Sequence, residues 1–129
     1  MAKLKIAQDP TFSAKVSIPR VGGAVVEADF QFKYRDRKEL AALFVKWNKR
    51  SQEDQERLKA LGDEVTLVEV TDSDIERQIE QVTDLVAGWS FADDLSEASI
   101  RALVQTSAGA GVAIVEAYQN AYAPARLGN

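Results

Sequence analysis

The sequence predicts an α+β fold, with an N-terminal β-hairpin packed against a mainly helical C-terminal half of about four helices. Apolar and polar residues alternate near the N-terminus, as in half-buried strands, and apolar residues recur at intervals of three and four further along, as on helices. The length of 129 residues fits a single core. We expect one domain over residues 1–129, with a flexible N-terminus at 1–11, the hairpin at 12–35, a helical region at 36–123 and a frayed tail at 124–129.

The predicted hairpin consists of two alternating segments joined by a turn. The first segment is Phe12-Ser13-Ala14-Lys15-Val16-Ser17-Ile18, and the second places Val26, Ala28, Phe30, Phe32 and Tyr34 on one face. Gly22 and Gly23 lie between them in a turn-rich connection. The glycine pair matches neither the Walker pattern nor the dinucleotide fingerprint, so we interpret it as a turn and not as a phosphate cradle.

The first helix is predicted to begin at Asp36, whose side chain and that of Glu39 have the spacing of a capping box. Leu40, Leu43, Phe44 and Trp47 then share one helical face. The chain is polar after Trp47, and Gly62 is a suitable stop. Either the helix continues toward Gly62 or a second short helix follows Trp47.

Residues 64–70 are rich in β-branched side chains and short enough for a third strand. An extended connector packed on the core has the same composition, so the sequence leaves both open.

A second capping box is predicted at Ser73 and Glu76, before a helix that ends near Gly88. Its apolar face is formed by Ile75, Ile79, Val82, Val86 and Trp89.

Two further helices are expected after this one. Ser96 is a good N-cap for a helix that buries Ile100, Leu103 and Val104, and Ser107 is the expected cap of the last helix. That helix carries a stripe flanked by Ile114 and ended by Pro124, consisting of Val112, Val115, Tyr118 and Tyr122. The small residues at 106–111 permit a close backbone approach where the last helix begins.

The sequence contains no cysteine and no histidine, which removes disulfides, thiolate chemistry, the usual metal ligand and the side chain that titrates near neutral pH. The adjacent acids Asp63-Glu64 and Asp93-Asp94 lie in predicted connections, where we interpret them as solvated caps. No calcium-loop pattern is present, and no serine has a nearby base in a Ser-x-x-Lys motif. We predict no enzyme activity, no catalytic residue, no cofactor and no metal.

The formal charge of −4 conceals an asymmetry between the two parts of the chain. Residues 1–50 carry 11 Lys and Arg against 5 Asp and Glu, whereas residues 51–129 carry 5 against 15. Such polarity either steers association with a partner or a second copy, or reflects solvated faces. The basic stretch at 33–38 suggests phosphate contacts, but the sequence pI near 4.9 argues against nucleic-acid binding. No segment has the length and apolar character of a leader or a membrane span, so we expect a cytoplasmic protein without a membrane partner.

A protein partner is the remaining class of ligand, and we select candidate contact residues from the basic segment and the large aromatics. The aromatic members fit a core as well as an interface. The candidates are Tyr34, Arg35, Arg37, Lys38, Lys46, Trp47, Trp89 and Tyr118.

The order of signals toward the C-terminus resembles a known family. Ile79-x-x-Val82-x-x-Leu85-Val86-x-x-Trp89, the acidic turn Asp93-Asp94-Leu95-Ser96 and the final Ala113-Ile114-x-x-Ala117-Tyr118 are similar to tail assembly chaperones of siphovirus-like bacteriophages and prophages. The hairpin and the helix that follows it belong to the same layout.

The resemblance implies a protein made in the host cytoplasm that binds the tape measure protein, helps to recruit major tail tube subunits and is absent from the mature virion. It implies no cofactor, and self-association would extend the coverage of the partner. A structural tail or connector subunit, and a small acidic regulator that binds nucleic acid or a host protein, remain the alternatives.

Overall fold

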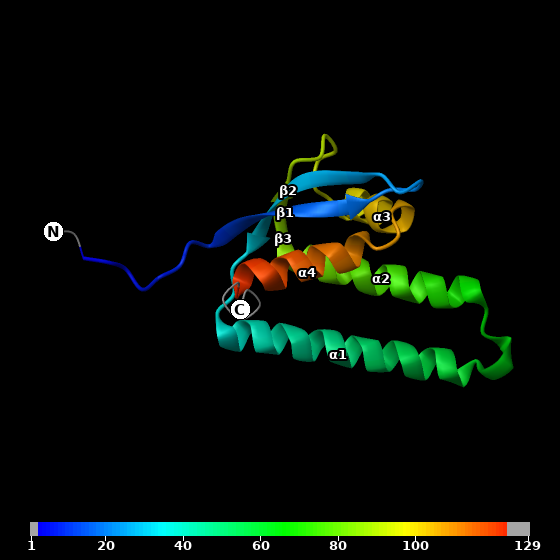
Figure 1. The fold of residues 1–129 in the computed structure, drawn as a ribbon. Helices are drawn as coiled ribbons and strands as arrows, with labels where there is room; N and C mark the ends of the chain where they lie inside the picture. The colour runs from blue at the N-terminus through cyan, green and yellow to red at the C-terminus, as the bar shows by residue number, and fades with distance from the viewer. Residues whose placement is uncertain (1–2, 124–129) are drawn as a thin grey trace.

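The computed structural model describes residues 3–123, which form a three-stranded antiparallel sheet and four α-helices and so confirm the predicted α+β class (Figure 1). The sheet has the order β1-β2-β3. The predicted tail at 124–129 lies outside the described residues. In chain order the elements are β1 (Thr11–Pro19), β2 (Val25–Lys33), α1 (Arg37–Ala60), the 3-10 turn η1 (Gly62–Glu64), α2 (Leu67–Leu85), β3 (Val86–Trp89), α3 (Glu97–Thr106) and α4 (Ala110–Tyr122).

The hairpin forms as the alternation predicts, with a register that runs from Thr11 opposite Lys33 to Pro19 opposite Val25. Its turn uses Gly22 and Gly23, both at positive φ, where glycine has no steric penalty. The inward side chains are buried, and they include Val16, Ile18, Ala28, Phe30 and Phe32. β1 is an edge strand, on which Lys15 points outward and pairs with Asp29 of β2 at 3.0 Å.

Helix α1 is a single element of 24 residues, so the first of the two alternatives, continuation toward Gly62, is correct. The capping box is present: the Glu39 amide donates to Asp36 Oδ1 at 2.8 Å, and Glu39 Oε1 accepts from the Asp36 amide at 3.0 Å. The helix ends at Ala60, and Gly62 follows with a φ of 59°.

The third strand suggested for residues 64–70 is wrong, because this stretch contains the start of α2. Thr66 is the N-cap, and its Oγ1 accepts from the Glu69 amide at 3.2 Å. Val68 is 68% and Val70 43% exposed, so no sheet covers these β-branched side chains, and the local cap decides the structure. Ser73, predicted as a cap, is therefore a buried residue inside α2 that accepts from Arg57 at 3.2 Å.

The helix predicted to include Val86 and Trp89 ends at Leu85, and the next four residues form β3. Apolar spacing alone does not separate a longer helix from a helix followed by a strand. Val86 is buried and Trp89 half-buried in β3, and the same two residues also continue the helical spacing. The free edge of β2 decides it by pairing Phe30 with Trp89. Gly88, predicted as a helix stop, lies in the strand beside Gln31.

The boundary between α3 and α4 differs from the prediction at one residue. Ser96 caps α3 as expected, accepting from the Ser99 amide at 3.1 Å. Ser107, the expected cap of the last helix, instead ends α3, and Gly109 begins α4 with a φ of 87°. Only a residue that tolerates this left-handed conformation reverses the chain here without strain.

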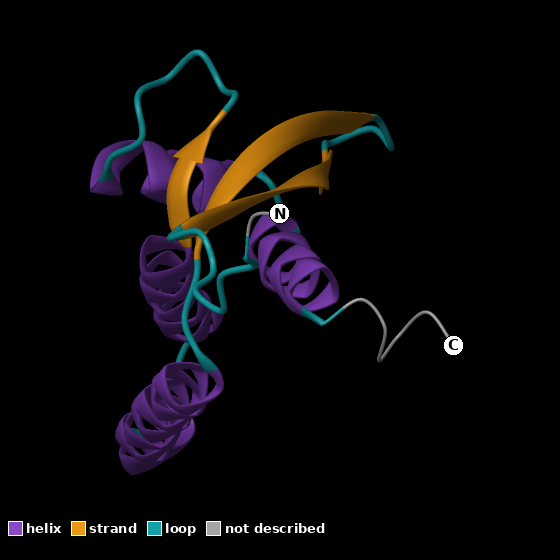
Figure 2. Ribbon diagram, turned by 90° about the vertical axis from the view of Figure 1, so that its left-hand side faces the viewer, coloured by secondary structure: helices purple, strands orange, loops and turns teal. Residues whose placement is uncertain are grey.

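The buried face of α4 is formed by Ala110, Gly111, Ile114 and Tyr118. Of the predicted stripe Tyr118 is buried, Val115 and Tyr122 are partly buried, and Val112 is exposed. The expected close backbone approach is present, since a Cβ on Gly111 would lie 2.5 Å from Gln78 Oε1 of α2. Helices α2 and α4 pack beneath the sheet, whereas α1 lies beyond α2, farthest from the strands (Figure 2).

In the described part of the chain no single helix is long and apolar enough to cross a membrane; α3 and α4 meet that test only as a pair bent by 109°.

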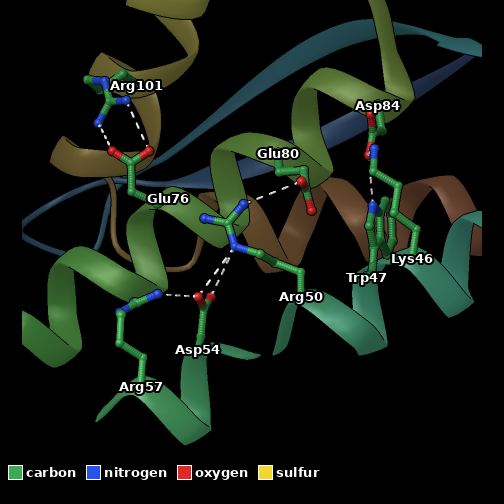
Figure 3. Close-up of polar contacts among 9 residues, drawn as sticks. All are labelled: Lys46, Trp47, Arg50, Asp54, Arg57, Glu76, Glu80, Asp84 and Arg101. Atoms are coloured by element: carbon green, nitrogen blue, oxygen red, sulfur yellow. Dashed lines mark hydrogen bonds and ion pairs between the residues drawn. The ribbon is translucent and has the colours of Figure 1, made fainter. Parts of the chain in front are cut away.

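Helix α1 is attached to α2 mainly through polar side chains (Figure 3), because Leu43 and Trp47 are its only buried apolar residues. Asp84 accepts from the Trp47 indole at 2.9 Å and from Lys46 at 3.0 Å. We call this set of contacts the polar seam. It further contains Arg50 with Glu80 at 3.4 Å, Arg57 with Asp54 at 2.9 Å, and Arg50 with Asp54 at 3.3 Å. Part of the charge asymmetry between the two halves of the sequence is thus paired within the fold.

Asp54 is the buried member of the polar seam, with 1% of its surface exposed. Burial raises the pKa of its carboxyl, but the hydrogen bond from Arg57 and the charge of Arg50 outweigh this and hold the pKa below its usual range. Because the folded-state pKa is lowered, the stabilisation is present at neutral pH and is lost as the pH falls through the folded pKa.

We expect Asp54→Asn to lower the free energy of unfolding at pH 7 by about 1–3 kcal/mol, the usual range for a charge-assisted hydrogen bond. The difference from the wild type should shrink as the pH falls below about 4, where the carboxyl of the unfolded chain takes up a proton, and should vanish once the pH has fallen through the lower pKa of the folded state. Urea unfolding at pH 7 and pH 3 measures both, with Glu53→Gln on the exposed side of α1 as the control. Equal stability of wild type and Asp54→Asn at pH 7 would contradict the assignment.

Candidate partner-binding surface

A tyrosine cluster joins the end of α4 to the segment between β2 and α1. The ring of Tyr122 stacks on Tyr118 at 6.0 Å and on Tyr34 at 6.2 Å between centroids. Tyr118 is buried, and its hydroxyl donates to the Lys33 carbonyl at 3.0 Å. Burial raises the pKa of Tyr118, although the positive charge of Arg35 works in the opposite direction. The cluster fixes where α1 begins relative to the end of α4.

Beside this cluster a hollow of about 790 Å³ lies between α1 and α4. Helix α1 contributes Arg37, Leu40, Ala41 and Phe44, and the chain near the end of α4 contributes Gln119, Asn120, Tyr122 and Ala123. A second hollow of about 390 Å³ shares Phe44 and Gln119 with the first. It continues toward Trp47, Asn48, Ser51, Arg77, Gln81 and Val115. We call the two together the α1–α4 groove.

The α1–α4 groove carries positive charge and no acidic side chain: Arg37 and Arg77 are its charged lining residues. Arg77 is paired with Asp74, whereas Arg37 and the neighbouring Lys38 are exposed and have no carboxylate within 4.0 Å among residues 3–123. A negatively charged partner therefore meets unpaired cations at this end of the groove.

The structure places seven of the eight sequence candidates in three groups. Tyr34, Arg35 and Tyr118 belong to the tyrosine cluster, and Arg37 and Lys38 lie at the neighbouring start of α1. Lys46 and Trp47 meet Asp84 in the polar seam. The contact role of these residues remains a prediction.

Trp89 lies away from the other seven candidates, in β3. Its ring makes edge contacts with Phe30 at 6.0 Å and Phe91 at 5.1 Å, and its indole donates to the Asp93 carbonyl at 2.8 Å. Trp47, at 7% exposure, and Tyr118, at 1%, are buried. All three are thus held by contacts within the chain.

The groove residues Leu40, Phe44 and Tyr122 are not among the contact candidates that the sequence suggested. Their helical spacing was visible, but it predicted a core face, and a stripe that lines a groove has the same spacing. The sequence contains no signal that separates these two possibilities, because they differ only in what lies opposite α1.

Comparison with known proteins gives one family. A family model described as "Phage tail assembly chaperone" matches residues 1–129 of the chain. No curated protein and no solved structure matches it.

The tyrosine cluster supplies a test of the structure. We expect Tyr118→Phe to lower the free energy of unfolding by about 1 kcal/mol, because the Lys33 carbonyl loses its donor in a buried place. Tyr122→Phe is the matched control, since the described residues offer its hydroxyl no hydrogen-bond partner. Urea unfolding of both variants checks this, and a smaller loss for Tyr118→Phe than for Tyr122→Phe would contradict it.

Proposed function

We propose that this chain, which belongs to the phage tail assembly chaperone family, binds the tape measure protein and recruits major tail tube subunits during tail assembly in the host cytoplasm. The family gives it a role in assembly in the host cell and not as a component of the virion. The match over residues 1–129 is the observation that carries the proposal. Tape measure binding and tube recruitment are the finer steps that we add to it.

The geometry supports a binding role because a surface suited to a protein partner lies outside the core. The α1–α4 groove combines aromatic and aliphatic side chains, among them Phe44 and Tyr122, with the cation of Arg37, which has no carboxylate partner among the described residues. Aromatic residues and arginine are the side chains most enriched at protein interfaces. A chaperone that covers apolar helical stretches of a long partner needs such a surface and no reaction chemistry.

The cations at the start of α1 are suited to fast, reversible association. Arg37 and Lys38 are exposed, so they can steer a negatively charged partner without the desolvation that a buried ion pair requires. Interactions of this kind weaken with added salt. A chaperone must release its partner when tube subunits replace it. A contact between exposed, screened charges is weak enough to make this release easier.

Co-expression with the tape measure protein of the same phage tests the proposal. We expect the tagged wild type to retain the tape measure protein, and the joint reversal of Arg35, Arg37 and Lys38 to Glu to reduce retention several-fold at low salt. The joint reversal of Lys3, Lys5 and Arg20 to Glu is the control for a change in charge alone, since all three are exposed and have no carboxylate within 4.0 Å among the described residues. Failure of the wild type to retain any tape measure protein would contradict tape measure binding.

Trp89→Ala separates folding from contact in the same experiment. Because the indole packs on Phe30 and Phe91, we expect this variant to lose about 3–5 kcal/mol of stability, the usual range for removing a large core aromatic. Thermal unfolding measures this loss. An equally stable Trp89→Ala variant that no longer retains the tape measure protein would instead make Trp89 a contact residue.

A further inference from the structure

We propose that the α1–α4 groove binds an amphipathic α-helix whose apolar face is flanked by Asp and Glu, so that α1, α2, α4 and the bound helix form a four-helix arrangement. The inference rests on the proposed function in one respect, since such a helix would belong to the protein partner. Its support comes from the length of the groove, the partly covered apolar margin of α4 and the distribution of charge.

The length of the groove fits a helix. On α1 its lining extends from Arg37 through Phe44 to Ser51, with steps of three and four residues along one helical face. At a rise of 1.5 Å per residue this face is roughly 20 Å long, enough for about four turns of a partner helix. Figure 2 shows α1, α2 and α4 nearly end-on, with α2 packed on both of the others. Helices α1 and α4 face each other across the groove, which is the remaining position of a bundle.

The apolar surface of α4 is wider than its buried face. Ala110, Ile114 and Tyr118 are buried in the core. Val115 and Tyr122, which adjoin them on the helix, are partly buried against the core and also line the groove, and Val112 is 53% exposed. The described residues therefore cover this apolar surface only in part, and its outer margin at the groove is open to a partner.

The charges select a partner with acidic flanks. The groove has no acidic lining residue, and neither Arg37 of its lining nor the adjacent Lys38 has a carboxylate within 4.0 Å among the described residues. A second copy of this chain is a poor occupant, because its most acidic helix, α2, already uses Glu80 and Asp84 to pair with its own α1. The aliphatic and aromatic floor at Leu40 and Phe44 also suits apolar side chains better than phosphates.

Two adjacent positions on α1 give a matched pair of variants. Ala41 lines the groove and Ala42 does not, yet both are exposed. Neither Ala41→Glu nor Ala42→Glu should change the fold of the free chain, which circular dichroism and thermal unfolding check. We expect Ala41→Glu to reduce retention of the co-expressed tape measure protein about tenfold, because the added carboxylate repels acidic flanks and neutralises Arg37, which lies one helical turn away. Ala42→Glu should stay within about twofold of wild type.

A second measurement does not depend on the tape measure protein. Two designed 15-residue amphipathic peptides share one leucine face, flanked by Glu in one and by Lys in the other. In amide NMR titrations of the full chain, we expect the Glu peptide to shift signals along the groove, including Phe44 and Val115, and the Lys peptide to bind at least tenfold more weakly. Ala41→Glu should weaken binding of the Glu peptide and Ala42→Glu should not.

The outcomes separate the two proposals. If both variants retain the tape measure protein as well as wild type and neither peptide shifts the groove signals, the groove proposal is wrong while tape measure binding stands. If wild type retains no tape measure protein but the Glu peptide binds in the groove, tape measure binding is wrong while the groove proposal stands. Sedimentation that shows a dimer which Ala41→Glu dissociates would make the occupant a second copy. A gain in peptide affinity on deleting residues 124–129 would make it the chain's own C-terminus, and either result overturns the proposal.

Discussion

The apolar inner face of the hairpin is the constraint on which the rest of this structure depends. Phe30 and Phe32 point inward from β2 and must be covered, and Tyr118 of α4 covers Phe32 with an edge contact at 5.3 Å. The helices α2, α3 and α4 complete this cover. Helix α1 contributes only Leu43 and Trp47 to the buried core, so the polar seam supplies much of its attachment to α2, and a groove is left between α1 and α4. The architecture of the candidate surface thus follows from how the sheet is closed.

Much of the fold could be predicted because local signals and tertiary packing agree over most of the chain. The alternation at Phe12 to Ile18 and the capping box at Asp36 each specify one structure, and the structure has them. Prediction failed where two local structures suit the same residues. The stretch Val65 to Val70 has strand composition but Thr66 caps a helix, and Val86 to Trp89 continues a helical spacing but pairs with β2.

The candidate site was harder to predict than the fold. Basic residues such as Arg37 could be chosen from charge alone, but charge does not show which cations have partners: Lys46 and Arg50 do, and Arg37 does not among the described residues. Aromatic residues posed the reverse difficulty, since Tyr118 and Trp89 are held within the fold whereas Phe44 and Tyr122 line the groove. An apolar stripe predicts that something covers it, and only the arrangement of the helices shows whether the cover comes from the same chain.

The edge strand β1 has a consequence for how this protein behaves when many copies accumulate. An uncovered edge exposes backbone groups that can pair with another chain and lead to aggregation. Lys15 points outward near the middle of β1, and Pro19 at its end has no backbone N–H to donate. A charged side chain and a proline are common protections against edge-to-edge pairing of sheets. The sheet can therefore keep one edge open at high protein concentration, while recognition of partners is left to side chains on the helices.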